Sequence, residues 1–182
     1  GDGLLTAAFG VIADSEIASE KPDVAIKAIS ALSRLAGVCG MIGGQEIDLT
    51  YENRSASLDV LEVLDSLKTG ALIRCAAYLG VISACDNEKY IAAADIYSKN
   101  IGHAFQIVDD IVDVIGDEKQ LGKPIGSDAQ SGKSTYVSLL GLEKSREYAE
   151  RLTKDAVDAL EVFGDESEFL KELAYSLVKR NN

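Results

Sequence analysis

Proline, cysteine and tryptophan are all rare in this chain of 182 residues, which contains two prolines, three cysteines and no tryptophan. Chains of this length usually contain about four times as many prolines, and a shortage of proline favours long helices. The cysteines are odd in number and lack metal-ligand spacing, which argues against a disulfide framework or a zinc site. We therefore expect Cys39, Cys75 and Cys85 to be buried and reduced, as in a cytoplasmic protein.

Positive charge is also in short supply, because 18 Lys and Arg residues face 30 Asp and Glu residues and the net charge is −12. This balance disfavours binding to nucleic acid or to an anionic membrane surface. The sequence lacks an uninterrupted apolar run of about 18 residues, so we expect no transmembrane segment. A content of 47% hydrophobic and 26% charged residues is typical of a globular protein, and we expect one domain over residues 1–182.

The spacing of apolar residues predicts an all-α protein. Ala149, Leu152 and Ala156, for example, fall on one face of a helix. Small residues on the helix faces let neighbouring helices approach closely, which suits a bundle around a central cavity. Six helices are expected, over residues 3–19, 22–50, 55–84, 87–114, 134–163 and 166–179.

The most informative local feature is the segment QIVDDIVD over residues 106–113. On a helix, Asp109 and Asp113 lie one turn apart on the same face, with Gln106 beside them and Asp110 at the edge. Carboxylates so close repel one another, and burial among β-branched residues raises the cost unless a cation neutralises them. Oxygen ligands in small number suit Mg²⁺, with Mn²⁺ as an alternative.

A segment rich in glycine and lysine, residues 115–133, follows these acids. A loop this long is uncommon in a compact helical protein and is often functional. Lys123 and Lys133 lie in it, and Lys68 on the third expected helix could face the same cavity. Because the whole chain repels anions, a diphosphate would have to be bound by lysines and by a metal ion on the aspartates.

These residues resemble the trans-isoprenyl diphosphate synthases, which include farnesyl and geranylgeranyl diphosphate synthases. The segment GHAFQIVDDIVD at 102–113 is similar to the family's second aspartate-rich motif, and LGKP follows it at 121–124. Two further stretches agree in the same order, GQEIDL at 44–49 and KTGA at 68–71. The resemblance implies an all-α fold around a central cavity and a reaction that joins an allylic diphosphate (dimethylallyl or geranyl) to isopentenyl diphosphate.

The resemblance also implies a role for each matching residue. Asp109 would bind magnesium directly, and Asp110 and Asp113 would bind the metal or its waters. Asp128 would belong to the outer shell of the metal. Lys68, Lys133 and Lys123 would contact the allylic diphosphate, Thr69 and Gln106 would direct oxygen dipoles at the developing cation, and Phe105 and Gln45 would contact substrate.

The chain departs from the family pattern because it has a single D-D-x-x-D segment, whereas the family has two. The opening GDGLLTAAF is similar to the stretch that follows the family's first motif. We therefore expect the C-terminal part of such an enzyme, without the N-terminal helices and inactive by itself. It would be a truncated form, a proteolytic product or a natural half-subunit.

Three alternatives differ in function. The first is a non-catalytic helical subunit that pairs with a complete prenyltransferase. The second is a synthase of geranylgeranyl or longer products; we favour farnesyl diphosphate because the loop and tail are similar to bacterial short-chain enzymes. The third is a terpene cyclase, which the Asp113 and Asp117 spacing and the following lysine-rich loop disfavour. The resemblance further implies a cytoplasmic homodimer.

Overall fold

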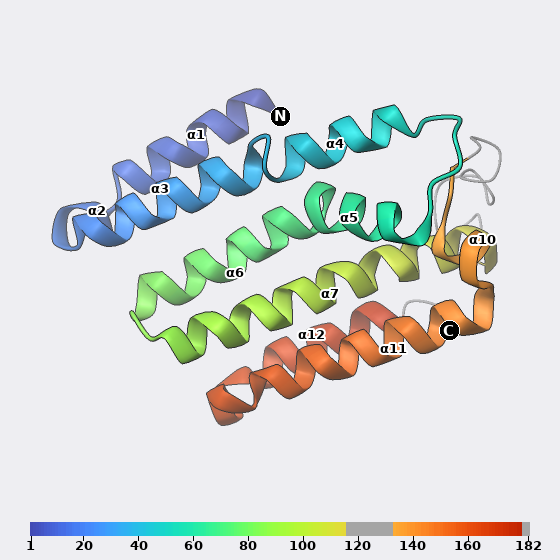
Figure 1. Ribbon diagram of the computed structural model, residues 1–182. Coiled ribbons are helices and arrows are strands. Elements are labelled where there is room, and N and C mark those ends of the chain that lie inside the picture. The colour runs from blue at the N-terminus through green and yellow to red at the C-terminus, as the bar shows by residue number, and fades with distance from the viewer. Residues whose placement is uncertain (116–132, 180–182) are drawn as a thin grey trace.

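The protein is a layered bundle of helices (Figure 1), known here from a computed structural model that describes residues 1–115 and 133–179. The described residues contain no strand, and the predicted all-α class is confirmed. The N-terminal elements are α1 (Asp2–Ala13), α2 (Glu16–Glu20), α3 (Pro22–Ala36), α4 (Met41–Thr50), α5 (Leu58–Lys68) and α6 (Gly70–Ala84). They are followed by α7 (Glu88–Ile115), α10 (Tyr136–Leu140), α11 (Leu142–Ala159), the 3-10 helix η1 (Leu160–Ser167) and α12 (Glu168–Val178).

Four of the six expected helices are broken, so the predicted bounds were too long. Ser15 ends the first and caps α2 by accepting a hydrogen bond from the amide of Ala18 at 3.2 Å. The second breaks at residues 37–40, and the third bends by 43° between α5 and α6 at Thr69. Gly141 separates α10 from α11 with a φ of 85°, a value that glycine adopts without strain.

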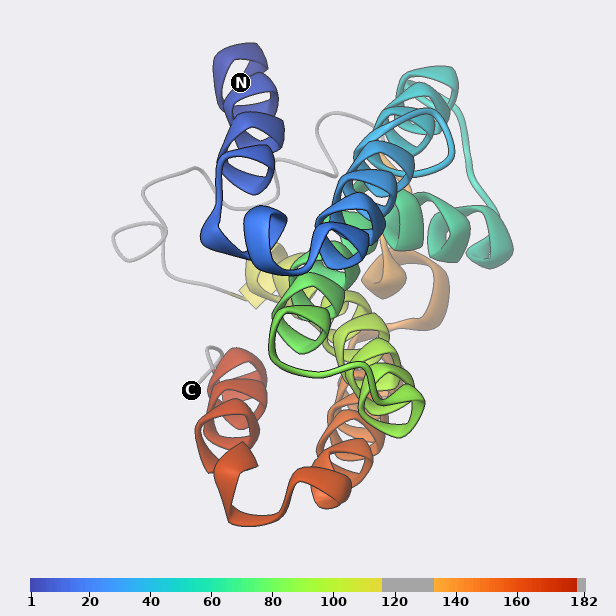
Figure 2. The same cartoon turned by 90° about the vertical axis from the view of Figure 1, so that its left-hand side faces the viewer.

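The longest helix, α7, lies between α6 and α11 in both views (Figures 1 and 2). Its apolar residues Ile107, Val108 and Ile111 are buried with Ala149 and Leu152 of α11 in one core cluster. Figure 2 shows α1 and α12 at opposite ends of the stack, on the same side of it. The central helix thus has one side in the core and another toward α5 and α10, where polar residues gather.

The predicted burial of the cysteines is confirmed for one residue only. Cys75 is buried on α6, whereas Cys85 is half-buried and Cys39 is exposed. Cys39 lies in the turn that interrupts the expected helix, so it is not on the apolar face that the periodicity assumed.

One stretch has the length and composition of a membrane span, Pro22–Thr50, and the bent pair α5 and α6 passes the same test as a unit. Core helices of soluble proteins share these properties. Pro22–Thr50 is interrupted by the turn at 37–40, and its α3 part packs against α6.

Candidate functional site

A polar cavity of about 170 Å³ lies between α4, α5, α7 and the segment that leads into α10. Lys68 and Asp65 enter it from the last turns of α5, and Asp48 enters it from α4. Gln106, Asp109 and Asp110 line it from α7, and Lys133, Ser134 and Thr135 complete the wall.

Lys68 is held in place by an ion pair and by close helix packing. Its Nζ atom lies 2.6 Å from Oδ2 of Asp48, and both side chains are partly buried. Gly44, one turn before Asp48, brings α4 against the backbone of Lys68, since a Cβ atom added there would lie 2.6 Å from the Lys68 Cα. Only glycine fits this contact, which places the lysine beside its carboxylate partner.

On the facing wall, Asp110 is fixed by the start of α10. Its Oδ2 atom accepts a hydrogen bond from the backbone amide of Tyr136 at 2.7 Å. Ser134 accepts one from the amide of Ala56 at 2.9 Å, which ties the segment before α10 to the segment before α5. The segment before α10 is therefore tied both to α7 and to the segment before α5 by hydrogen bonds from backbone amides to side chains.

A buried hydrogen-bond network lies behind the cavity. Tyr136 is fully buried, and its Oη atom lies 2.6 Å from Nε2 of His103 and is hydrogen-bonded to Asp65. Asp65 is 6% exposed. Burial raises its pKa to about 7, although the hydrogen bond from Tyr136 and the charge of Lys68 oppose the shift. Burial, followed by the charge of Asp65, raises the pKa of Tyr136, and burial lowers that of His103.

The charges around the cavity bear on whether a metal ion fits. Three cations, Arg54, Lys68 and Lys133, face five acids, Asp48, Glu52, Asp65, Asp109 and Asp110. Among residues 1–115 and 133–179, no three His, Cys, Asp or Glu side chains are placed to hold a metal ion together. Two carboxylates from α7 do line the cavity, and Mg²⁺ typically binds one or two carboxylates and completes its shell with water and phosphate oxygens. The residues present therefore fit a magnesium ion that is shared with a phosphorylated ligand.

The structure brings together five of the residues that the sequence suggested. These are Lys68, Gln106, Asp109, Asp110 and Lys133.

The other suggested residues lie elsewhere. Gln45 and Thr69 are half-buried and do not line this cavity, and Asp113 is buried outside it. Phe105 lines an apolar cavity of about 320 Å³ between α6, α7 and α12. Lys123 and Asp128 lie outside the described residues.

Three residues at this site were missed as candidates: Asp48, Asp65 and Tyr136. Asp48 was visible in the segment GQEIDL, but only its pairing with Lys68 gives it a role. Asp65 follows Leu61 and Leu64 on the apolar face of α5, and an acid on such a face is a signal in itself. Tyr136 had no signal in its neighbourhood, because its partners come from distant segments.

The chain is similar to known proteins in sequence and in fold. The sequence profile of the polyprenyl synthetase family matches residues 1–173. The chain belongs to the polyprenyl synthetase family. The family resemblance read from the four motifs is therefore confirmed.

Individual relatives include farnesyl diphosphate synthase of Escherichia coli strain K12, which is 43% identical over 185 residues. Among solved structures, geranylgeranyl pyrophosphate synthetase of Pyrococcus horikoshii superposes with a TM-score of 0.87 at 28% identity, over 98% of this chain and 65% of that one. Helicobacter pylori geranyltransferase, solved with magnesium and isoprenyl diphosphate, gives 0.79 at 30% identity, over 97% and 57%. The match to the Escherichia coli enzyme spans all of this chain but 62% of that enzyme's length.

Proposed function

We propose that this chain is the diphosphate-binding part of a prenyltransferase that condenses dimethylallyl or geranyl diphosphate with isopentenyl diphosphate to give farnesyl diphosphate. The observation that carries the proposal is the polar cavity in which Lys68 and Lys133 face Asp109 and Asp110. A lysine wall and a carboxylate wall across one small space suit a diphosphate that binds the lysines directly and the carboxylates through a divalent cation.

In this mechanism the chain's residues stabilise the diphosphate as it leaves the allylic carbon. Lys68, held by Asp48, and Lys133 would contact its oxygens, so that negative charge developing on the leaving group meets fixed positive charge. Mg²⁺, or Mn²⁺ in its place, would be held by Asp109 and Asp110 and would supply Lewis-acid stabilisation of the same oxygens. The amide oxygen of Gln106, on the same wall, would face the allylic cation.

Residues outside the polar cavity receive supporting roles. Thr69 lies at the bend directly after Lys68, and Gln45 lies next to Gly44 on α4. Both would therefore help to position Lys68 and its ion-pair partner Asp48. Phe105 and the apolar cavity it lines would hold prenyl chain and keep water from the cation. The roles of Asp113, Lys123 and Asp128 as metal and phosphate ligands stay predictions from the resemblance.

The whole reaction needs more than the residues of this chain. With one aspartate-rich segment, residues 1–182 by themselves should have no prenyltransferase activity, and we infer that the enzyme is a cytoplasmic homodimer. A farnesyl product is favoured over geranylgeranyl or longer products.

The binding half of the proposal is tested by thermal unfolding with Mg²⁺, inorganic pyrophosphate, or both. At about 100 times the Kd, both together should stabilise the fold by about 3 kcal/mol, which raises the Tm by about 5–10 °C. Asp109→Ala should abolish the shift, whereas Asp155→Ala at an exposed position of α11 should retain it. An equal shift in Asp109→Ala would place the ligand elsewhere.

The catalytic half is tested by adding the N-terminal segment of a full-length relative and measuring incorporation of isopentenyl diphosphate. Rescue by that segment, lost in Lys68→Ala, supports a prenyltransferase. The alternative, a non-catalytic helical subunit, requires that no such segment restores activity while the chain still binds a complete partner enzyme.

A further inference from the structure

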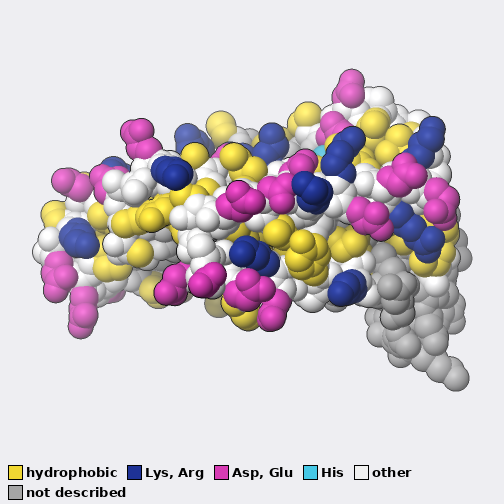
Figure 3. All heavy atoms as spheres, turned by 90° about the horizontal axis from the view of Figure 1, so that it is seen from below, with side chains coloured by type: hydrophobic (Ala, Val, Ile, Leu, Met, Phe, Trp, Pro, Cys, Tyr) yellow, Lys and Arg dark blue, Asp and Glu magenta, His cyan; other side chains and the backbone are white. Residues whose placement is uncertain are grey.

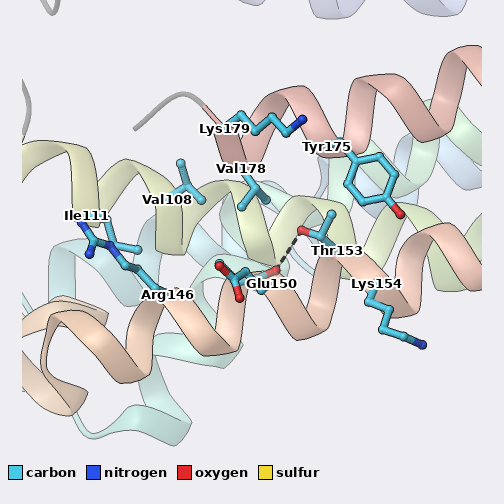
Figure 4. Close-up of a pocket in the computed structure, with 10 residues that line it drawn as sticks. Val108, Ile111, Arg146, Glu150, Thr153, Lys154, Tyr175, Val178 and Lys179 are labelled. Carbon is cyan, nitrogen blue, oxygen red and sulfur yellow. Dashed lines mark hydrogen bonds between the residues drawn. The ribbon is translucent and has the colours of Figure 1, made fainter. Parts of the chain in front are cut away.

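A separate cavity is lined by other residues of α7 than those that line the polar cavity. It is a groove of about 550 Å³ between α11 and α12, with α7 as its floor (Figure 4). Val108 and Ile111 reach it from the side of α7 opposite to Gln106 and Asp110, because residues on a helix are rotated by about 100° each. The groove therefore does not belong to the diphosphate site.

The floor of the groove is apolar. Val108, Ile111 and Ala149 are at most 3% exposed, and Val178 packs against the same core cluster from α12. The hydroxyl of Thr153 donates to the carbonyl oxygen of Ala149 at 2.8 Å, which is the dashed line in Figure 4. A ligand lying on this floor would thus meet carbon atoms and no unsatisfied donor.

The rim is cationic, in contrast to the net charge of −12. Arg146 from α11 and Lys179 after α12 lie on opposite sides of the opening, and Glu150 is the one acid among the lining residues (Figure 4). Lys179 has no ion pair within residues 1–115 and 133–179. Arg146 contacts the exposed Glu143 at 3.2 Å, a weak surface pair that a ligand could replace.

The fourth charged residue of the lining has a different role. Lys154 points away from the groove in Figure 4 and pairs with Asp158 at 2.6 Å. Figure 3, a view from the side on which α11 and α12 lie in Figure 1, shows hydrophobic side chains between scattered charges of both signs.

We propose that this groove binds an anionic amphiphile, a short apolar chain that ends in a carboxylate or phosphate group. The chain would lie on Val108, Ile111 and Val178, and the head group would lie between Arg146 and Lys179. The volume is within the range of about 300–1,000 Å³ that small-molecule sites occupy, and the combination of an apolar wall and a few placed charges is typical of such sites. The proposal is independent of the diphosphate chemistry at the polar cavity.

The chain provides a clean reporter for the test, because it contains no tryptophan. Tyr175, on the rim and 47% exposed, can be changed to give Tyr175→Trp with one fluorophore at the groove. Decanoate, decyl phosphate and the neutral decyl glucoside, each below its micelle concentration, are then titrated by fluorescence and by calorimetry. The two anionic probes separate a carboxylate head from a phosphate head.

The decisive comparison uses two double variants with the same loss of charge. Arg146→Gln with Lys179→Gln should weaken binding of the anionic probes at least tenfold. Lys144→Gln with Lys171→Gln, on the same two helices but outside the lining, should change it less than twofold. Asp109→Ala should bind the probes like the wild type, which separates this proposal from the one for the diphosphate site.

Two results would overturn the proposal. Equal binding of the anionic probes by both double variants would place them elsewhere on the surface. Equal binding of the neutral glucoside would mean that the groove selects apolar surface alone, as expected for a docked protein segment. If the double variant loses its helical circular dichroism, each single substitution at the rim is titrated instead, with a loss of at least threefold expected.

Discussion

Replacing Asp65 by asparagine should stabilise the protein at neutral and alkaline pH. In the folded protein burial holds the pKa of this carboxyl at about 7, against 3.8 for an unperturbed aspartate. Because the pKa of this carboxyl is higher in the folded than in the unfolded state, its contribution to the free energy of unfolding is fully present below the unfolded-state pKa. That contribution is lost as the pH rises to the folded-state pKa. Three pH units correspond to about 4 kcal/mol, which is the cost of ionising Asp65 in the fold.

Urea unfolding at about pH 5.5 and about pH 8 measures this cost. Because the wild type loses about 1.4 kcal/mol for each pH unit up to 7, the free-energy difference between Asp65→Asn and the wild type should grow by about 2 kcal/mol between the two conditions. His103, the single histidine, is present in both proteins and cancels. Asp155→Asn, at an exposed position, should show no such growth. If Asp65→Asn is no more stabilised at pH 8 than at pH 5.5, the carboxyl is not held neutral by burial.

Two further substitutions test how the lysine wall and the buried network are built. Gly44→Ala should lower the free energy of unfolding in urea by about 1–3 kcal/mol, because the new methyl group would meet the backbone of Lys68. Gly80→Ala, where a Cβ meets nothing within 4 Å on a helix, should raise it by about 0.5–1 kcal/mol; equal effects at both positions would contradict the close packing. Tyr136→Phe should cost about 1–3 kcal/mol and extend the pH-dependent loss of stability above pH 7, since Asp65 loses the hydrogen bond that opposes its raised pKa. Unchanged pH dependence in Tyr136→Phe would mean that the hydroxyl does not act on Asp65.

Helical periodicity and four short motifs were sufficient to predict the fold class and the family. They did not predict where the long helices break. Thr69 is neither glycine nor proline, although Gly70 follows it, and the apolar periodicity of residues 55–84 did not reveal the bend of 43° at this point.

Only part of the candidate site could be predicted, because its residues come from several helices. Gln106, Asp109 and Asp110 follow from spacing along one helix, and the structure places them on one wall. Asp48 and Tyr136 act through residues 20 and 26 positions away, and no pattern within a single helix carries such pairings. The sequence alone could therefore identify each wall, but not the contacts that join the walls.

The bend at Thr69 makes the number of residues between α5 and α6 important for both cavities. Before it, Asp65 and Lys68 face the polar cavity; after it, Ile73 and Ala77 face the apolar one. Inserting or deleting a single residue there would rotate all of α6 relative to α5 by about 100° and turn Ile73 out of its cavity while Lys68 stayed in place. The number of residues between Lys68 and Ile73 therefore determines whether both cavities keep their lining side chains at the same time.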